Sequence, residues 1–131
     1  MIWRSVCELK DQNSKTKILI VDDEEDITLS FKRILEFKGF EVDAYNDPTV
    51  ALAEFRSNYY DVALIDIKMP HLDGFDLYKK IKEFDNNLRI YFLTASEAYY
   101  QQYREKDYEK LDRDLFIQKP IEFEDLIKKI R

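Results

Sequence analysis

Residues 17–26 read KILIVDDEED, and residues 61–66 read DVALID. Each stretch contains four apolar residues in a row, Ile18–Val21 and Val62–Ile65, and aspartic acid follows directly. A strand that is apolar at every position is typical of the middle of a parallel sheet, where helices cover both faces. The two runs therefore predict the central strands of an α/β fold.

Three further apolar runs complete a set of five, and segments of helical period follow them. They are Phe40–Tyr45, Leu88–Leu93, which Arg89 interrupts, and Leu115–Ile117. In the first, apolar residues alternate with Glu41 and Asp43, which indicates a half-exposed strand at a sheet edge. Alternation of short strands with helices predicts a parallel sheet built from β/α units.

Apolar stripes at helical spacing and residues typical of helix ends mark the intervening helices. Gly39 stands where a helix ends in the left-handed conformation, and Asp47 and Pro48 fit the N-cap and first position of the next helix. Glu97 to Arg113 is interpreted as a mostly exposed helix. The stripes are Ile27, Phe31, Ile34, Leu35; Ala51, Leu52, Phe55; Leu77, Tyr78, Ile81, Phe84; and Phe123, Leu126, Ile127, Ile130.

The composition is that of one ordinary domain. Of 131 residues, 45% are hydrophobic and 37% charged, so a core can form without disulfides. Residues 1–16 show no usable period and are interpreted as an N-terminal extension, which leaves 17–131 for the domain. A chain of this length is not expected to be a multidomain enzyme.

Charge, cysteine and glycine content exclude several classes of function. The net charge of −6 argues against a nucleic-acid-binding surface, which must neutralise phosphates. Cys7 has no partner for a disulfide, and no apolar run approaches the ~20 residues that span a bilayer. With only Gly39 and Gly74, a glycine-rich phosphate loop cannot be written. We expect a cytoplasmic protein that binds neither nucleic acid nor membrane.

Polar side chains stand at the predicted strand ends, where open parallel sheets bind ligands. Asp22 and Asp23 follow the first strand, Asp66 the third, Thr94 the fourth, and Lys119 the last. Three nearby carboxylates favour a hard cation such as Mg²⁺, and a carboxylate can attack phosphorus. A hydroxyl and an ammonium group suit the charge compensation that phosphoryl transfer requires. The pattern indicates phosphoryl transfer to Asp66.

Each of these residues also has an ordinary interpretation. Asp22 or Asp23 could cap the first helix, because Asp23 followed by Asp26 resembles a capping arrangement. A strand-end threonine and a single lysine are common. Asp66 is harder to dismiss, since a buried carboxylate needs a partner or a metal. The joint placement at four strand ends favours a site.

The chain from Lys17 to Arg131 resembles the receiver domain of two-component response regulators. KILIVDDEED, DVALIDIKMPHLDGFDL, FLTAS and FIQKPIEFEDL stand in the order of that family. The resemblance implies a flavodoxin-like fold, a doubly wound five-stranded parallel sheet of order 2-1-3-4-5 with helices on both faces. It leaves out only the N-terminal extension.

The resemblance also implies roles for single residues. Asp66 would be the phosphoacceptor, and Mg²⁺ would be held by Asp22, Asp23, Asp66 and the main-chain carbonyl of Lys68. Thr94 and Phe116 would form the switch, with Lys119 as the ion-pair partner of the phosphoryl group and a cis peptide bond before Pro120. Each role is assigned only to a residue whose position matches the family's motif.

Some positions depart from the commoner family pattern. The stretch from Thr94 to Lys119 is lengthened, so the family's usual mode of dimerisation or partner binding does not transfer, although a homodimer is possible. Phe116 stands where tyrosine is frequent. Lys68 and Ser96 occupy positions that tune dephosphorylation in the family, which leaves the lifetime of a phosphorylated form open.

The sequence therefore predicts a signalling phosphoacceptor that catalyses only its own phosphorylation and dephosphorylation. The donor would be a sensor histidine kinase or a phosphotransfer protein, and the output partner is unknown. The sequence ends at Arg131, and a stand-alone receiver, a relay and a fragment of a longer protein all stay open. The alternatives are a Mg²⁺-dependent phosphatase with an aspartyl nucleophile, which normally carries an acid where Lys68 stands, and a degenerate receiver that works without phosphorylation.

Overall fold

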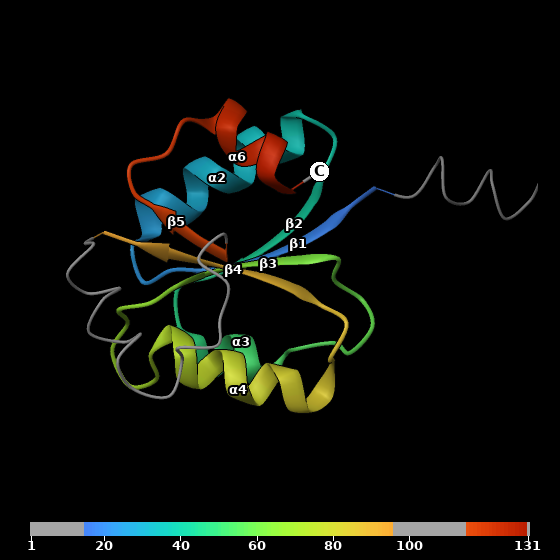
Figure 1. Ribbon diagram of the computed structural model, residues 1–131, viewed down its shortest axis with the longest axis vertical. Coiled ribbons are helices and arrows are strands. Elements are labelled where there is room, and N and C mark those ends of the chain that lie inside the picture. Colours follow the sequence, from blue (N-terminus) through green and yellow to red (C-terminus); the bar gives the residue numbers. More distant parts are fainter. Residues whose placement is uncertain (1–14, 96–114, 131) are drawn as a thin grey trace, which may run out of the picture.

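In the computed structural model, which describes residues 15–95 and 115–130, parallel strands form one sheet of order β2-β1-β3-β4-β5 (Figure 1). Every neighbouring pair is parallel, so the carboxyl ends of all strands lie at the same edge of the sheet. This confirms the predicted topology. The strands are β1 (Lys17–Val21), β2 (Glu41–Tyr45), β3 (Val62–Asp66), β4 (Arg89–Thr94) and β5 (Phe116–Gln118).

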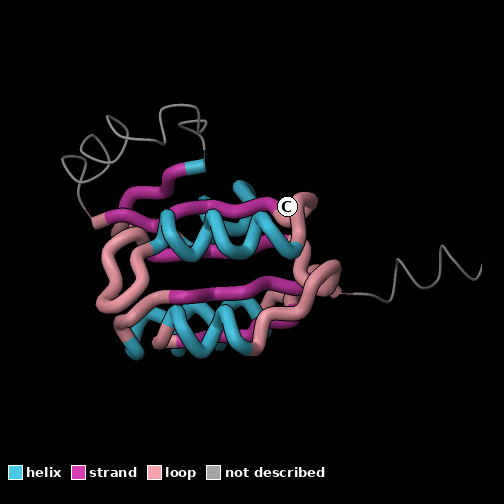
Figure 2. The backbone as a smooth tube through the Cα atoms, turned by 90° about the horizontal axis from the view of Figure 1, so that it is seen from below, coloured by secondary structure: helices cyan, strands magenta, loops and turns pink. Residues whose placement is uncertain are grey.

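Helices cover both faces of the sheet. Figure 1 shows α2 (Glu25–Phe37) and α6 (Phe123–Ile130) on one face, and α3 (Pro48–Ala53) and α4 (Gly74–Phe84) on the other. The loops gather at the two ends of this sandwich (Figure 2). Most of the predicted N-terminal extension and the predicted helix between Glu97 and Arg113 lie outside the described residues. In the part that is described, every helix is too short or too polar to cross a membrane.

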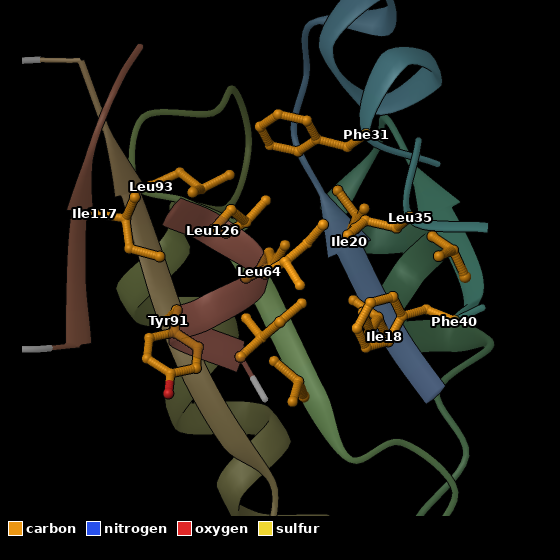
Figure 3. Packing of buried hydrophobic residues seen from close by; sticks show 14 residues of the cluster. Ile18, Ile20, Phe31, Leu35, Phe40, Leu64, Tyr91, Leu93, Ile117 and Leu126 are labelled. Atoms are coloured by element: carbon orange, nitrogen blue, oxygen red, sulfur yellow. The ribbon is translucent and has the colours of Figure 1, made fainter. Parts of the chain in front are cut away.

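Two apolar clusters, one on each face, hold these layers together. Alternate residues of β1 point to opposite faces, so Ile18 and Ile20 pack toward α2 and α6, whereas Leu19 and Val21 pack toward α3 and α4. Figure 3 shows the first cluster, in which Leu126 of α6 lies over the sheet. Because Ile18–Val21, the four apolar residues of β1, are fully buried, β1 is a central strand, as its unbroken apolar run predicts.

The strand boundaries differ from the predicted runs by one residue at several ends. β3 and β4 continue past their last apolar residue to Asp66 and Thr94. Main-chain pairing with the neighbouring strand continues at these positions, with Asp66 opposite Leu93 and Thr94 opposite Gln118. Asp66 and Thr94 are thus part of the strands rather than of the loops.

The ends of the helices agree with the predicted caps. Asp47 is the N-cap of α3, where its side chain accepts a hydrogen bond from the Thr49 N–H, and Pro48 is the first helical residue. Gly39 has a φ of 98°, the left-handed conformation expected after α2. Arg89, which interrupts the fourth apolar run, is exposed at the start of β4 and donates to the Ile130 carbonyl at the end of α6.

Gly74 at the start of α4 packs directly against the end of β3. A Cβ at this position would collide with the Asp66 carbonyl oxygen and lie 2.9 Å from the Ile67 Cα. We expect Gly74→Ala to lower the free energy of unfolding by about 2–3 kcal/mol, because main-chain atoms must move. Chemical denaturation measures this loss.

Gly39→Ala is the matched control, since a Cβ there meets open space and the positive φ alone opposes it. Its expected cost is about 1 kcal/mol. Equal losses in the two variants would contradict the close packing of Gly74 against Asp66.

Candidate functional site at the carboxyl edge of the sheet

A cavity of about 650 Å³ opens at the carboxyl edge of the sheet. Asp22 directly follows β1, Asp66 ends β3, Thr94 ends β4 and Lys119 directly follows β5. The structure therefore brings together the strand-end residues that the sequence singles out. The cavity is lined by Asp23, Glu24, Asp66, Ile67, Lys68, Met69, Pro70, Thr94, Ala95 and Lys119.

Three carboxylates form a compact cluster in this region. Asp22, Asp23 and Asp66 each offer one oxygen atom, and these atoms all lie within 4.8 Å of one another. Asp22 and Asp66 are buried, whereas Asp23 is exposed. An all-oxygen donor set with several negative charges suits a hard divalent cation that keeps part of its water shell, which is the preference of Mg²⁺.

The ammonium group of Lys119 partly compensates the buried negative charge. Its Nζ lies 2.7 Å from Asp22 Oδ2, 3.5 Å from Asp66 Oδ1 and 3.7 Å from Glu24 Oε1. Burial by itself would lower the pKa of Lys119, but the hydrogen bond to Asp22 and the charge of Asp66 raise it above its ordinary value. Lys119 is therefore a fixed positive charge that faces the cavity.

The environment of Asp66 shifts the pKa of its carboxyl group. Burial, followed by the charge of Asp22, raises the pKa of Asp66 to about 7, against the lowering effect of Lys119. One lysine thus does not offset the desolvation of Asp66 and its repulsion by a second buried carboxylate. A bound divalent cation would supply the missing positive charge.

The structure decides the capping interpretation of the acid pair. Glu24, not Asp23, is the N-cap residue of α2, and the Glu24 side chain makes no capping hydrogen bond. The hypothesis that Asp23 serves as a helix cap is therefore wrong. Asp22 accepts a hydrogen bond from the Glu24 N–H, 3.0 Å away, which fixes one carboxylate oxygen and leaves Asp23 at the mouth of the cavity.

The remaining predicted residues lie near the cavity in different ways. The side chain of Thr94 is buried at the end of β4, and Lys68 lies in the loop that follows β3. The Phe116 ring stacks on Phe92 at 5.2 Å and lies 6.0 Å from Phe75. The peptide bond between Lys119 and Pro120 is cis. A switch role of Thr94 and Phe116 and a ligand role of the Lys68 carbonyl stay predictions.

The sequence did not predict two of the residues at the site. Glu24 directly follows the acid pair but reads as part of an exposed acidic turn, and only the fold brings it near Lys119. Asn46 lies in the loop after β2, and its side chain donates to the Asp22 carbonyl oxygen. Its position in the sequence, among turn residues, gives no signal of this contact.

Comparison with known proteins assigns the chain to a family. A family model described as the response regulator receiver domain matches residues 18–131. The chain belongs to the response regulator receiver domain family. It is accordingly a domain of two-component signal transduction, and its acidic cluster is typical of the Mg²⁺ site of receivers.

The similar proteins include a transcriptional regulatory protein and a sensor protein. The transcriptional regulatory protein RprY of Bacteroides fragilis is 30% identical over 92% of this chain, and the sensor protein EvgS of Escherichia coli is 39% identical over 63% of it. The matched regions are 50% of RprY and 7% of EvgS, so this receiver domain spans about half the length of RprY and far less of EvgS.

A solved structure supports the fold assignment. The CheY-like receiver domain protein of Methanospirillum hungatei superposes with a TM-score of 0.75 at 30% identity, covering 89% of this chain and 91% of the other. Fold and family thus rest on agreement over nearly all of the chain.

The raised pKa of Asp66 predicts how stability of the metal-free receiver domain depends on pH. Between about pH 4 and pH 7 the unfolded chain loses the Asp66 proton while the folded chain keeps it, so this group stabilises the fold at low pH and the contribution is lost as pH rises through about 7. We expect Asp66→Asn to raise the free energy of unfolding by about 1–3 kcal/mol at pH 8, and by much less at pH 4.

Urea denaturation of both proteins across this pH range, without divalent cations, measures the difference. Saturating Mg²⁺ is the control, because it stabilises the ionised wild-type site and should remove the advantage of the variant. A difference between the proteins that does not change from pH 4 to pH 8 would show that Asp66 titrates normally.

Proposed function

We propose that this receiver domain is a phosphoacceptor in which Asp66 takes a phosphoryl group from a phosphohistidine. The donor is a sensor histidine kinase or a phosphotransfer protein, and the reaction depends on Mg²⁺. The phosphorylated form then changes a protein-interaction surface that an output partner reads. Membership in the receiver family and the strand-end cluster support this proposal.

One observation carries the proposal: a buried carboxylate that faces a cavity containing both opposite charge and further acids. Asp66 is 5% exposed, lines the cavity and has Lys119 Nζ at 3.5 Å. A structural ion pair would not require two additional carboxylates within 4.8 Å. This surplus of negative charge is understandable if the site works with a cation.

The side chains divide the chemistry of the transfer between them. A carboxylate oxygen of Asp66 forms a bond to phosphorus while the P–N bond of phosphohistidine breaks, and the departing imidazole takes up a proton from solvent. Lys119 and the Thr94 hydroxyl are placed to balance charge on the phosphoryl oxygens. Asp22, Asp23, Asp66 and the Lys68 carbonyl would hold Mg²⁺, which would supply further charge neutralisation.

Transfer of the phosphoryl group offers a simple route to a conformational signal. Thr94 ends β4, and the ring of Phe116 lies on the adjacent strand β5, stacked against Phe92. A hydroxyl drawn toward the phosphoryl group would alter the space beside this ring and shift a two-state equilibrium. We propose that Thr94 and Phe116 report the state of Asp66 to the surface.

Intact-mass measurement after incubation with Mg²⁺ and acetyl phosphate tests the proposal. We expect the wild-type protein to gain the mass of one phosphoryl group and Asp66→Asn to gain none, because the amide is not a nucleophile toward phosphorus. Omission of Mg²⁺ should abolish most of the gain, since the cluster then lacks its cation.

Asp61→Asn is a matched control, because Asp61 lies just before β3, at the opposite end of that strand from Asp66. It should be labelled like the wild type. Equal labelling of wild type and Asp66→Asn would contradict the assignment of Asp66 as the phosphoacceptor. Release of many equivalents of phosphate from a phosphomonoester would instead favour the phosphatase.

A further inference from the structure

We infer that Asn46 is a positioning residue of the Mg²⁺ site, which fixes the loop bearing the acid pair although it ligates no cation itself. The inference deepens the proposed function and rests on its Mg²⁺ site. Asn46 lies directly after β2, in the loop that leads to α3. Its side chain reaches across to the loop between β1 and α2, which carries Asp22 and Asp23.

Both hydrogens of the Asn46 amide are used in this contact. Nδ2 donates to the main-chain carbonyl oxygen of Asp22 at 3.0 Å and to Thr28 Oγ1 at 2.8 Å. A primary amide nitrogen carries two hydrogens and can donate both of them without carrying a charge. The short Asn side chain also fits the distance between the two neighbouring loops. The side chain therefore bridges the acidic loop and the first turn of α2.

Asp22 is held at its main chain and its side chain by these neighbours. Its N–H donates to the Tyr45 carbonyl at 3.1 Å, and its carbonyl accepts from Asn46. Its carboxylate accepts from the Glu24 N–H through Oδ1 and from Lys119 through Oδ2. Residues 45 and 46 thus satisfy both main-chain groups of Asp22, which is fully buried.

Thr28 connects this bridge to the first turn of α2. Its hydroxyl, in a residue that is 4% exposed, accepts from Asn46 and donates to the Glu25 carbonyl at 2.9 Å. The hydrogen bond from Asn46 to Thr28 ties the first turn of α2 to the loop after β2. The loop between β1 and α2 is consequently anchored at both of its ends.

Such anchoring matters because the acid pair is under electrostatic strain. Without a cation, Asp22, Asp23 and Asp66 repel one another, and a loose loop would let the first two carboxylates separate. Holding the ligands in place before the cation binds lowers the ordering cost of binding. Loss of groups that orient metal ligands weakens metal binding by about tenfold or more.

Calorimetric titration with MgCl₂ alone tests the inference without any phosphorylation step. We expect Asn46→Ala to raise the Kd for Mg²⁺ about tenfold, and Thr28→Val should also raise this Kd. Thr28→Ser keeps the hydroxyl and should bind like the wild type. Thr49→Val is the matched control, because the Thr49 hydroxyl donates to Asp47, the N-cap of α3, rather than to a residue of the loop between β1 and α2.

All titrations are made at a temperature where thermal melts show each variant folded, so that a loss of stability alone leaves the Kd unchanged. An Asn46→Ala protein with the wild-type Kd would overturn the inference. If that variant does not fold, equal Kd values for Thr28→Val and Thr28→Ser would overturn it. Saturating Mg²⁺ should restore acetyl phosphate labelling of Asn46→Ala to the wild-type rate.

These outcomes separate the inference from the proposed function. A wild-type protein that binds Mg²⁺ but takes up no phosphoryl group contradicts the phosphoacceptor role, and the Kd ratios still decide the role of Asn46. A wild-type protein that is labelled, with no change of Kd in Asn46→Ala, contradicts the inference alone.

Discussion

The ammonium group of Lys119 lies among carboxylates that it does not fully neutralise. It forms a 2.7 Å ion pair with Asp22 and lies 3.5 Å from Asp66, while Asp23 offers a third carboxylate oxygen within 4.8 Å of the other two. Two like unit charges 4.8 Å apart repel one another by about 3–4 kcal/mol at an effective dielectric constant near 20. Burial and then this imbalance raise the pKa of Asp66, and the imbalance explains the expected need for a divalent cation.

Sheet topology is what makes this arrangement possible. Lys119 and Asp22 are 97 positions apart in the sequence. The carboxyl ends of the parallel strands nevertheless lie at one edge of the sheet, where β1, β3 and β5 bring Asp22, Asp66 and Lys119 together. The two apolar clusters hold the strands rigidly. Asn46 then links the loops after β1 and β2, so that a rigid scaffold continues into the loop that carries the acid pair.

The unbroken apolar runs of the sequence predicted that β1 and β3 are central, and Asp22, Asp66 and Thr94 were recognised at strand ends, whereas the strand order was implied by the resemblance to receiver domains. Strand ends were off by one residue because pairing across the sheet, not apolarity, decides where a strand stops. The contacts of Glu24 and Asn46 could not be predicted. Both depend on side chains that reach between segments distant in the sequence, and no local pattern records such a contact.

The most direct test of this account is the titration of the Asp66 carboxyl group by carbon-detected NMR, with and without Mg²⁺. The account predicts a midpoint near pH 7 in the metal-free protein, and a carboxylate that stays ionised to much lower pH when Mg²⁺ is saturating. Asp66→Asn identifies the resonance by its disappearance. A metal-free midpoint near pH 4, unchanged by Mg²⁺, would contradict the claim that the buried cluster lacks positive charge and that a divalent cation supplies it.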